Sequence, residues 1–540
     1  MGKALVLKVR QKRKGSDYMR VSWMFMRILL IAAASFFVCI LTGTQRMEPC
    51  VKLRISLQSD KNGEGSYLFL PSFVKLSNVE VQVPGQQTTG EILSEENDSG
   101  TVTVRTETGE RKAQVCRSGN VPSLFLETEE LLEKLEADKA NVSAGRFTLY
   151  LPDGRMTERG EIAAVHGHGN STWYENKKSW LMELAGRKSL LGMSSAKKWL
   201  LISNAKDASM MRNKLFMDMS KDCSLPGALS CEWVDLYING EYQGLYLLSE
   251  KVDIAAGRLE IGNLEQENKD LNGDVTSYMN YTIPGEETLL QGWFLPENPK
   301  NITGGYLLEM DYPVRYAAEP SKFITRNGQH VVVKNPAYAS VEQIQYIYGF
   351  VQDFESALYA EDGCIAQGEE LDPGRTGMAY TEVLDIDSFA KRYVLDEISK
   401  NIDANSSSVF FYKPRYEDRL YAGPVWDYDL ALGNSGDWGD AGNLHDPEGY
   451  YVNLSGWNKA LYGKPEFYAA VEQCYQEDYA PWLEELLSGG FDEYKEQIRQ
   501  AAGMDNLYRG VDNWEEDADE MRIFLEKRKK WLDEQWGGKK

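Results

Sequence analysis

The sequence is poor in the side chains that bind transition metals. Its 540 residues include only four histidines and seven cysteines, and no two cysteines form a C-x-x-C pair, so a zinc site is not expected. It also contains no internal repeat and no long low-complexity tract, which argues against a repeat architecture and against disorder. The formal net charge of -23 argues against nucleic acid as a partner.

The N-terminal region differs from the rest in charge and hydropathy. Residues 1–27 carry eight Lys or Arg against a single Asp, and residues 28–41 carry no charge. Counted from Val21, the apolar span approaches the roughly 20 residues that cross a bilayer. We therefore expect a basic cytoplasmic segment at 1–27 and a transmembrane anchor at 21–43, with the bulk of the protein extracytoplasmic. A cleaved signal peptide, which would leave a secreted protein, is the alternative.

The pattern of the remaining chain predicts an α+β protein. Residues 48–122 alternate between apolar and polar side chains and are interrupted by turn residues, which predicts a small β-rich module. The run SLFLETEELLEKLEADKA, residues 123–140, predicts a helix. Beyond about residue 145, strands alternate with helices, and a hairpin is expected at Asn239-Gly240. Cys223 and Cys231 flank a short loop that a disulfide would close, with two free buried thiols as the alternative.

Three aspartates are expected to meet although they lie apart in the sequence. Asp403 follows a predicted helix, and Asp427 and Asp429 follow 24 and 26 residues later, across a predicted hairpin. We interpret the doublet as strand-end residues that share one face, with Tyr428 on the other. Carboxylates without neighbouring histidines suit Mg²⁺ or Mn²⁺. The alternative is a structural Ca²⁺ site, to which three further acids would contribute: Asp437, Asp440 and Asp446.

The stretch HGHGNST, residues 166–172, is a candidate phosphate-binding turn. Gly167, Gly169 and Asn170 would let the backbone approach a phosphate group closely. Lys178 on the following strand would supply a cation, whereas Lys177 should point away by strand alternation. Amides, a lysine, metal-binding carboxylates and a carboxylate near the acceptor hydroxyl are the parts that phosphoryl transfer requires.

These blocks occur in a familiar order. The runs HGHGNSTWYENKKSWLMEL, LLGMSSAKKWLLISNAKDASMMRNKL, EWVDLYINGEYQGLYLLSEKVDI, GGYLLEMD, EISKNIDANSSSVFFYKP and GPVWDYDLALGN resemble the CotH kinase family, named for a spore coat protein H. The resemblance implies an atypical protein-kinase-like, two-lobed domain over 145–540, with lobes at about 145–254 and 255–540. It also implies ATP and Mg²⁺ or Mn²⁺, and phosphorylation of Ser or Thr in surface or envelope proteins.

The resemblance also implies roles for individual residues. Asp403 would be the catalytic aspartate, Asp427 and Asp429 would hold metal, and Lys178 would bind the nucleotide. Residues 248–252 would face the adenine. Two of them, Glu250 and Lys251, are expected to contact the cofactor. The block containing Arg212 and Asn213 receives no role.

Two positions depart from the pattern that the resemblance implies. His168 stands where the family commonly has Arg, and Ser408 stands where a protein kinase has a metal-binding Asn. Asn405 is expected to substitute as a metal ligand. These departures keep two alternatives open: a catalytically inactive surface binding or assembly protein of spore coat or envelope type, and a Ca²⁺-stabilised carbohydrate-binding protein.

Overall fold

The computed structural model describes residues 52–60, 63, 65–96, 100–284, 289–366, 372–436 and 443–538. The predicted basic segment, 1–27, and the predicted membrane segment, 21–43, lie outside these residues. Within the described ranges, every helix is too short or too polar to cross a bilayer. The predicted membrane anchor, and the localisation that depended on it, are therefore not supported.

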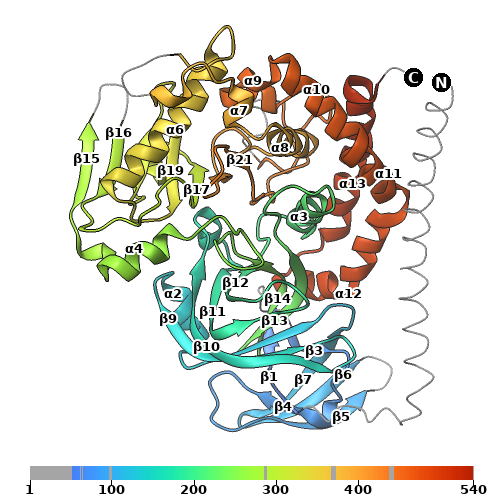
Figure 1. Cartoon of the computed structure of the whole chain (residues 1–540). Helices are drawn as coiled ribbons and strands as arrows, with labels where there is room; N and C mark the ends of the chain where they lie inside the picture. Colours follow the sequence, from blue (N-terminus) through green and yellow to red (C-terminus); the bar gives the residue numbers. More distant parts are fainter. Residues whose placement is uncertain are drawn as a thin grey trace, which may run out of the picture. The chain divides into compact units, whose positions relative to one another are not determined.

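The N-terminal module consists of two sheets that lie against the next part of the chain (Figure 1). Strands β1 and β4 pair in parallel, and a five-stranded sheet has the order β2-β3-β7-β6-β5. The side chain of Gln58 donates to the carbonyl of Tyr242 and accepts from its amide, which fixes the module to the neighbouring hairpin. The strands are β1 (Leu53–Ser56), β2 (Gln58–Ser59), β3 (Ser66–Pro71), β4 (Val79–Gln82), β5 (Glu91–Glu96), β6 (Thr101–Thr106) and β7 (Gly109–Ser118).

Seven strands then close into a barrel with the order β10-β11-β12-β14-β13-β8-β9. The helix predicted for residues 123–140 is wrong: Ser123–Thr128 is strand β8, and only Leu132–Ala137 is helical. Leu124 and Leu126 of SLFLET fill the barrel, whereas Phe125 packs in the core of the N-terminal module. The segment is a strand because β8 pairs with β13 and β9. The other strands are β9 (Val142–Tyr150), β10 (Met156–His168), β11 (Ser179–Lys188), β12 (Ala196–Ile202), β13 (Cys231–Ile238) and β14 (Glu241–Glu250).

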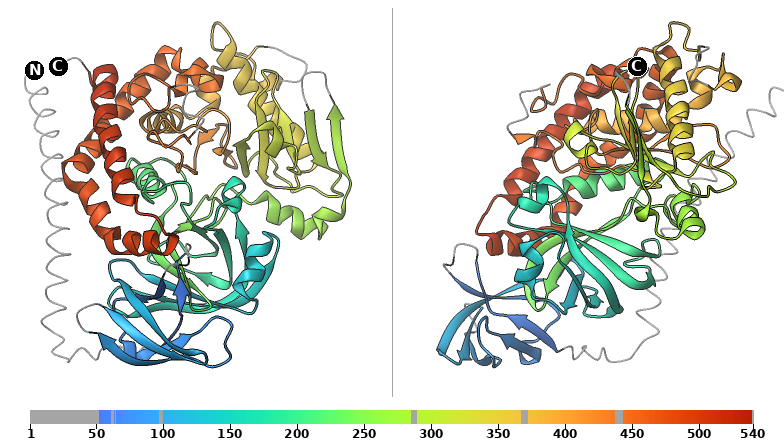
Figure 2. Two further views of the ribbon diagram at one scale, coloured as in Figure 1. Left: turned by 180° about the vertical axis from the view of Figure 1, so that it is seen from behind. Right: turned by 90° about the vertical axis from the view of Figure 1, so that its left-hand side faces the viewer.

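One specific prediction for this part of the chain is confirmed. The hairpin at Asn239-Gly240 joins β13 to β14. A helix, α3 (Arg212–Asp222), follows β12 and lies between the barrel and the next helical layer in Figure 1 and Figure 2. The predicted disulfide is not present, because Cys223 and Cys231 are both free and buried.

The C-terminal part combines a seven-stranded sheet, order β15-β16-β18-β19-β17-β20-β21, with helices. Its strands are β15 (Asn280–Pro284), β16 (Leu289–Trp293), β17 (Tyr306–Met310), β18 (Lys322–Ile324), β19 (His330–Asn335), β20 (Val409–Lys413) and β21 (Tyr421–Ala422). Its helices are α4 (Leu264–Asn272), α5 (Pro313–Tyr316), α6 (Val341–Tyr359), α7 (Tyr380–Val383), α8 (Ile386–Ser399), α9 (Gly456–Tyr462), α10 (Pro465–Cys474), α11 (Ala480–Glu485), α12 (Phe491–Arg509) and α13 (Trp514–Trp536).

Helix α12 returns to the barrel and joins it to the C-terminal helices (Figure 1). Its Asp505 is completely buried, accepts from the amide of Leu245, and pairs with Lys177 at 2.7 Å. Gly244, with φ +114°, leaves the space for this carboxylate, because a Cβ on residue 244 would lie 1.9 Å from Oδ1 of Asp505.

The fold-class prediction is therefore wrong as stated. It placed an α+β, kinase-like two-lobed domain behind a transmembrane helix. The described residues instead form a mixed α/β structure with a closed barrel and open sheets, and they include no membrane helix.

Candidate active site

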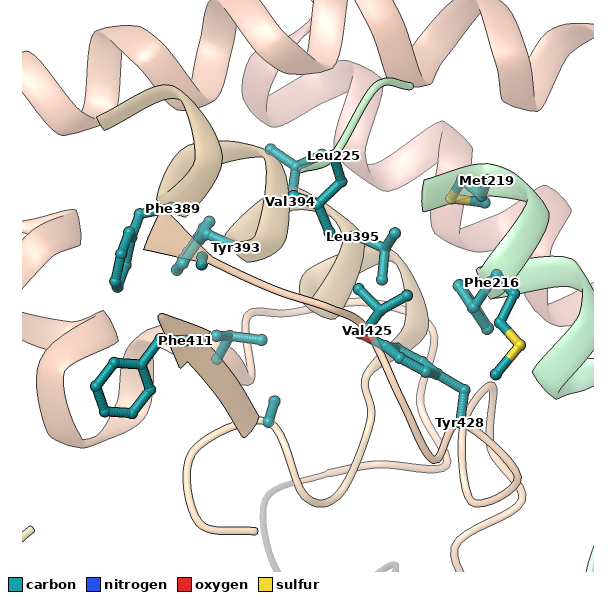
Figure 3. Packing of buried hydrophobic residues seen from close by; sticks show 14 of the residues in the cluster. Phe216, Met219, Leu225, Phe389, Tyr393, Val394, Leu395, Phe411, Val425 and Tyr428 are labelled. Carbon is teal, nitrogen blue, oxygen red and sulfur yellow. The ribbon is translucent and has the colours of Figure 1, made fainter. Parts of the chain in front are cut away.

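The acidic turn at residues 426–429 is held by the buried Tyr428. Its ring stacks on Phe216 of α3 with centroids 4.9 Å apart, and its hydroxyl donates to Asp396 of α8 at 2.5 Å. Figure 3 shows Val425 and Tyr428 packed among side chains of α3 and α8. The amide of Tyr428 donates to Asn213 Oδ1 at 2.8 Å, which gives a role to the block that the sequence left unassigned. The turn is thus fixed from the core side.

The doublet does not lie on a strand. Strand β21 ends at Ala422, and Asp427 has φ +68°, in the left-handed region. The argument from strand alternation was therefore wrong for this turn. Its conclusion that Tyr428 points away from the two acids holds, because the tyrosine ring is in the core.

Asp403 lies beside Asp427, as the predicted hairpin requires. Strands β20 and β21 pair antiparallel, which returns the chain to the end of α8. Asn401 links the two acids: its Oδ1 accepts from the amide of Asp403 at 3.2 Å, and its Nδ2 donates to the carbonyl of Asp427 at 3.3 Å. The hydroxyl of Tyr312 donates to Asp403 Oδ1 at 2.8 Å and orients that carboxylate.

The three acids perturb one another. Burial, followed by the charge of Asp427, raises the pKa of Asp403 to about 6, and the hydrogen bond from Tyr312 opposes the rise. Burial also raises the pKa of Asp427, against the bond from Ser408, and it raises the pKa of Asp429 well above its usual range, with the Asp427 charge next in importance. Among the described residues, no lysine or arginine lies within ion-pair distance of these three carboxylates.

Ser408 takes the place next to the acid that the sequence assigned to Asn405. The hydroxyl of Ser408 donates to Asp427 Oδ2 at 3.2 Å. Asn405 instead donates to the carbonyl of Val452 and accepts from Asn458, each at 3.0 Å. Both ends of its amide are used away from the acidic turn, so the structure does not bring Asn405 to the acids.

The glycine turn lies at the tip of the β10–β11 hairpin. Trp173 packs on Gly167, where a Cβ would come within 2.3 Å of the indole ring, and Gly169 has φ +91°. Asn170 is exposed. The His168 ring lies edge-on to Trp426 with centroids 6.4 Å apart, so the turn reaches the residue before Asp427. Burial, with a contribution from the Lys251 charge, lowers the pKa of His168 to about 4.

The lysine pair before β11 is arranged differently from the prediction. Lys177, expected to point away, is buried against Asp505. The ammonium of Lys178 donates to the carbonyls of Trp173 and Glu175, at 2.7 and 2.8 Å. Lys178 therefore stabilises the glycine turn from within, and its contacts are to backbone oxygens.

The two residues expected near the adenine lie at the end of β14. Glu250 is buried, and its two oxygens accept from the amides of Ser194 and Ser230 at 2.8 and 3.0 Å, so its carboxylate holds two loops. Lys251 donates to the carbonyl of Val252 at 3.2 Å, and burial lowers its pKa. Its charge acts on His168, which places Lys251 near the glycine turn.

Three residues that sequence reasoning missed belong to the site. Tyr312 contacts Asp403, and Arg315 lies over the Tyr312 ring at 5.4 Å, where its charge lowers the pKa of both Asp403 and Asp427. Lys206 acts in the same way on the acidic doublet. The sequence runs that resemble the family contain Lys206 and end just before Tyr312 and Arg315. The directions of these three side chains depend on the fold, so the sequence alone did not place them in the site.

The donor set fits a divalent cation that also binds phosphate. Among the described residues, no three His, Cys, Asp or Glu side chains are grouped closely enough to form a metal site by themselves. Mg²⁺ is usually held by one or two carboxylates together with phosphate oxygens and water. Asp427 and Asp429, which lie one residue apart and form no ion pair within the described residues, meet that requirement.

The site thus combines oxygen ligands, a candidate proton acceptor and a glycine turn in a mixed α/β protein. A model of the CotH kinase protein family matches residues 165–532, about two thirds of the chain. The chain belongs to this family and is kinase-like, which confirms the resemblance seen in the sequence. Among curated proteins, none matches the chain.

Proposed function

We propose that this protein transfers the γ-phosphate of ATP to the hydroxyl of Ser or Thr in a protein substrate, with Mg²⁺ or Mn²⁺. The observation that carries the proposal is the grouping of Asp403, Asp427 and Asp429, which form no ion pair with a lysine or arginine of the described residues, beside a glycine turn. Buried carboxylates that repel one another are costly unless a cation neutralises them. The metal and the phosphate chain supply opposite charges that balance in such a site.

Asp403 is the residue to which we assign the acceptor side. With a pKa of about 6, its carboxylate is mostly ionised at pH 7. It accepts a hydrogen bond from the substrate hydroxyl, and Tyr312 holds it in orientation. The hydroxyl oxygen bonds to the γ-phosphorus as the bond to ADP breaks, ADP leaves with the electron pair, and the hydroxyl proton passes to Asp403.

Asp427 and Asp429 would hold the divalent cation. When bound, the cation neutralises charge on the phosphate oxygens. The core anchor at Tyr428 and the bond from Ser408 hold Asp427 in its left-handed conformation, so the carboxylate needs little rearrangement when the cation arrives.

The test is phosphate transfer from ATP by the full chain with Mn²⁺ or Mg²⁺, read as incorporation into serine or threonine. The variant Asp427→Asn should lose at least about 100-fold in rate, because it loses the charge that holds the cation. Asp418→Asn is the matched control: it changes an aspartate of the same β20–β21 hairpin whose side chain is 75% exposed. If the wild type transferred phosphate no faster than the Asp427→Asn variant does, the proposal would be contradicted. A binding protein without catalysis would then be favoured.

A further inference from the structure

Lys206 lies in the connection between β12 and α3, next to the acidic turn. Its carbonyl accepts a hydrogen bond from Asn434 Nδ2 at 2.8 Å, and the same nitrogen donates to the carbonyl of Asp429 at 2.7 Å. The following residue, Asp207, is completely buried and accepts from the amide of Arg212 at 2.9 Å. The backbone of Lys206 is therefore fixed against the segment that carries the acids.

The ammonium of Lys206 reaches the glycine turn. It donates to the hydroxyl of Ser171 at 3.2 Å. Its backbone is held beside the acidic turn by Asn434, which also donates to the carbonyl of Asp429. Lys206 thus lies between the turn that would lie over the phosphates and the segment whose carboxylates would hold the cation.

The lysine pair before β11 is less available. The Lys178 ammonium has two backbone carbonyls and the ring of Trp173, 5.2 Å from its centroid. Lys177 is buried in an ion pair with Asp505. Moving the Lys178 ammonium to a ligand would break the hairpin tip, and moving the Lys177 ammonium would leave a buried carboxylate without its counter-charge, which is strongly destabilising. Lys206 would give up one neutral hydroxyl.

We propose that Lys206 is the lysine that binds the phosphate chain of the nucleotide, the role that the sequence suggested for Lys178. The inference rests on the proposed function and assigns a residue within that site. On binding, the ammonium exchanges the Ser171 hydroxyl for phosphate oxygens and forms a charge-assisted bond, which is stronger than a bond to a neutral oxygen. Lys178 remains a structural residue of the turn.

The test compares nucleotide affinities of the full chain in Mn²⁺, measured by isothermal titration calorimetry. Lys206→Gln should weaken ATP binding by about 10- to 100-fold, the range expected for one bond between charged groups. Adenosine, which has no phosphate, should bind the variant as it binds the wild type. Lys206→Arg keeps the charge and should recover most of the ATP affinity.

Lys197→Gln provides the matched control, because Lys197 is an exposed lysine on strand β12 of the barrel. It should leave both affinities unchanged. If Lys206→Gln does not fold, Lys206→Ala replaces it in the same comparison. A reduced ATP affinity with an unchanged adenosine affinity supports Lys206, and an ATP affinity equal to that of the wild type overturns the inference.

The proposed function can fail separately. A wild-type protein that binds ATP and transfers phosphate, with Lys206→Gln unchanged in ATP affinity, overturns the inference alone. A wild-type protein that binds neither ATP nor adenosine overturns both.

Discussion

Two groups of carboxylates in this protein, one fully buried and the other half-buried or buried, differ in how their charge is balanced. Glu397 pairs with Arg528 at 2.9 Å, Asp505 with Lys177 at 2.7 Å, and Asp207 with Arg212 at 2.5 Å. In these pairs the fold supplies the cation. The acids of the candidate site, Asp403, Asp427 and Asp429, have no such partner among the described residues. The first group therefore serves the fold, and the second is suited to a cation that arrives with a ligand.

The largest effect on stability is expected when a paired acid is changed. Glu397 is completely buried and also accepts from the amides of Tyr451 and Val452, and its partner Arg528 is equally buried. Glu397→Gln would leave the guanidinium without a counter-charge. We expect the free energy of unfolding, measured by urea denaturation, to fall by about 3–5 kcal/mol.

The control for this change lies on the same helix as Arg528. Glu526 pairs with Arg522 at 3.2 Å, but its side chain is 52% exposed. Glu526→Gln should change the free energy of unfolding by less than about 0.5 kcal/mol. If Glu397→Gln and Glu526→Gln lowered the free energy of unfolding equally, burial of an ion pair would not determine how much it contributes to stability.

Asp235 tests the comparison from another direction, because it is buried and forms no ion pair with any described lysine or arginine. The Tyr242 hydroxyl donates to its Oδ1 at 3.1 Å, and its Oδ2 has no hydrogen-bond partner in the part of the chain that the structure describes. Burial raises its pKa to about 7. Because the pKa of Asp235 is higher in the folded state than in the unfolded state, where it is near 4, its contribution to the free energy of unfolding depends on pH. This contribution is complete below the unfolded-state pKa and is lost as the pH rises through 7.

We therefore expect Asp235→Asn to remove a pH dependence. Between pH 5 and pH 8 the wild type should lose about 2–3 kcal/mol more of its free energy of unfolding than the variant does. Urea denaturation at several pH values measures this difference. Asp512→Asn, a change at an exposed aspartate, should keep the wild-type profile, and an Asp235→Asn profile that also matches it would show that Asp235 is ionised throughout.

The sequence predicted the meeting of Asp403 and Asp427 because that meeting depends on local features. A helix, an apolar strand and a short hairpin fix how the chain returns, and these elements are confirmed as α8, β20 and β21. The predicted geometry of the doublet was wrong because the left-handed conformation of Asp427 depends on packing around Tyr428, which involves α3 from a distant part of the sequence.

The directions of the lysine side chains also depend on residues that are distant in the sequence. Strand alternation favoured Lys178 over Lys177, but β11 begins only at Ser179, so the rule did not apply to either residue. The direction of Lys177 follows from Asp505 of α12, and the position of Lys206 follows from Asn434. Strand β8 was read as a helix for a similar reason, since its strand partners are distant in sequence.

The smallest effect on stability is expected at the candidate site itself. Asp427→Asn removes a charge that burial disfavours, and asparagine tolerates the left-handed conformation at φ +68° well. Its side-chain oxygen can still accept from Ser408. In buffer without divalent cations, we expect the free energy of unfolding to stay within about 1 kcal/mol of the wild type, or to rise.

Divalent cations should then separate the two proteins. Mn²⁺ at about 100 times its dissociation constant would stabilise the wild type by about 2.7 kcal/mol, and it should have little effect on Asp427→Asn. Thermal melting with and without Mn²⁺ measures this difference. If Asp427→Asn instead destabilises the metal-free protein as strongly as Glu397→Gln does, then Asp427 belongs with the paired acids that hold the fold, and the distinction between the two groups fails at the residue on which the proposed function depends.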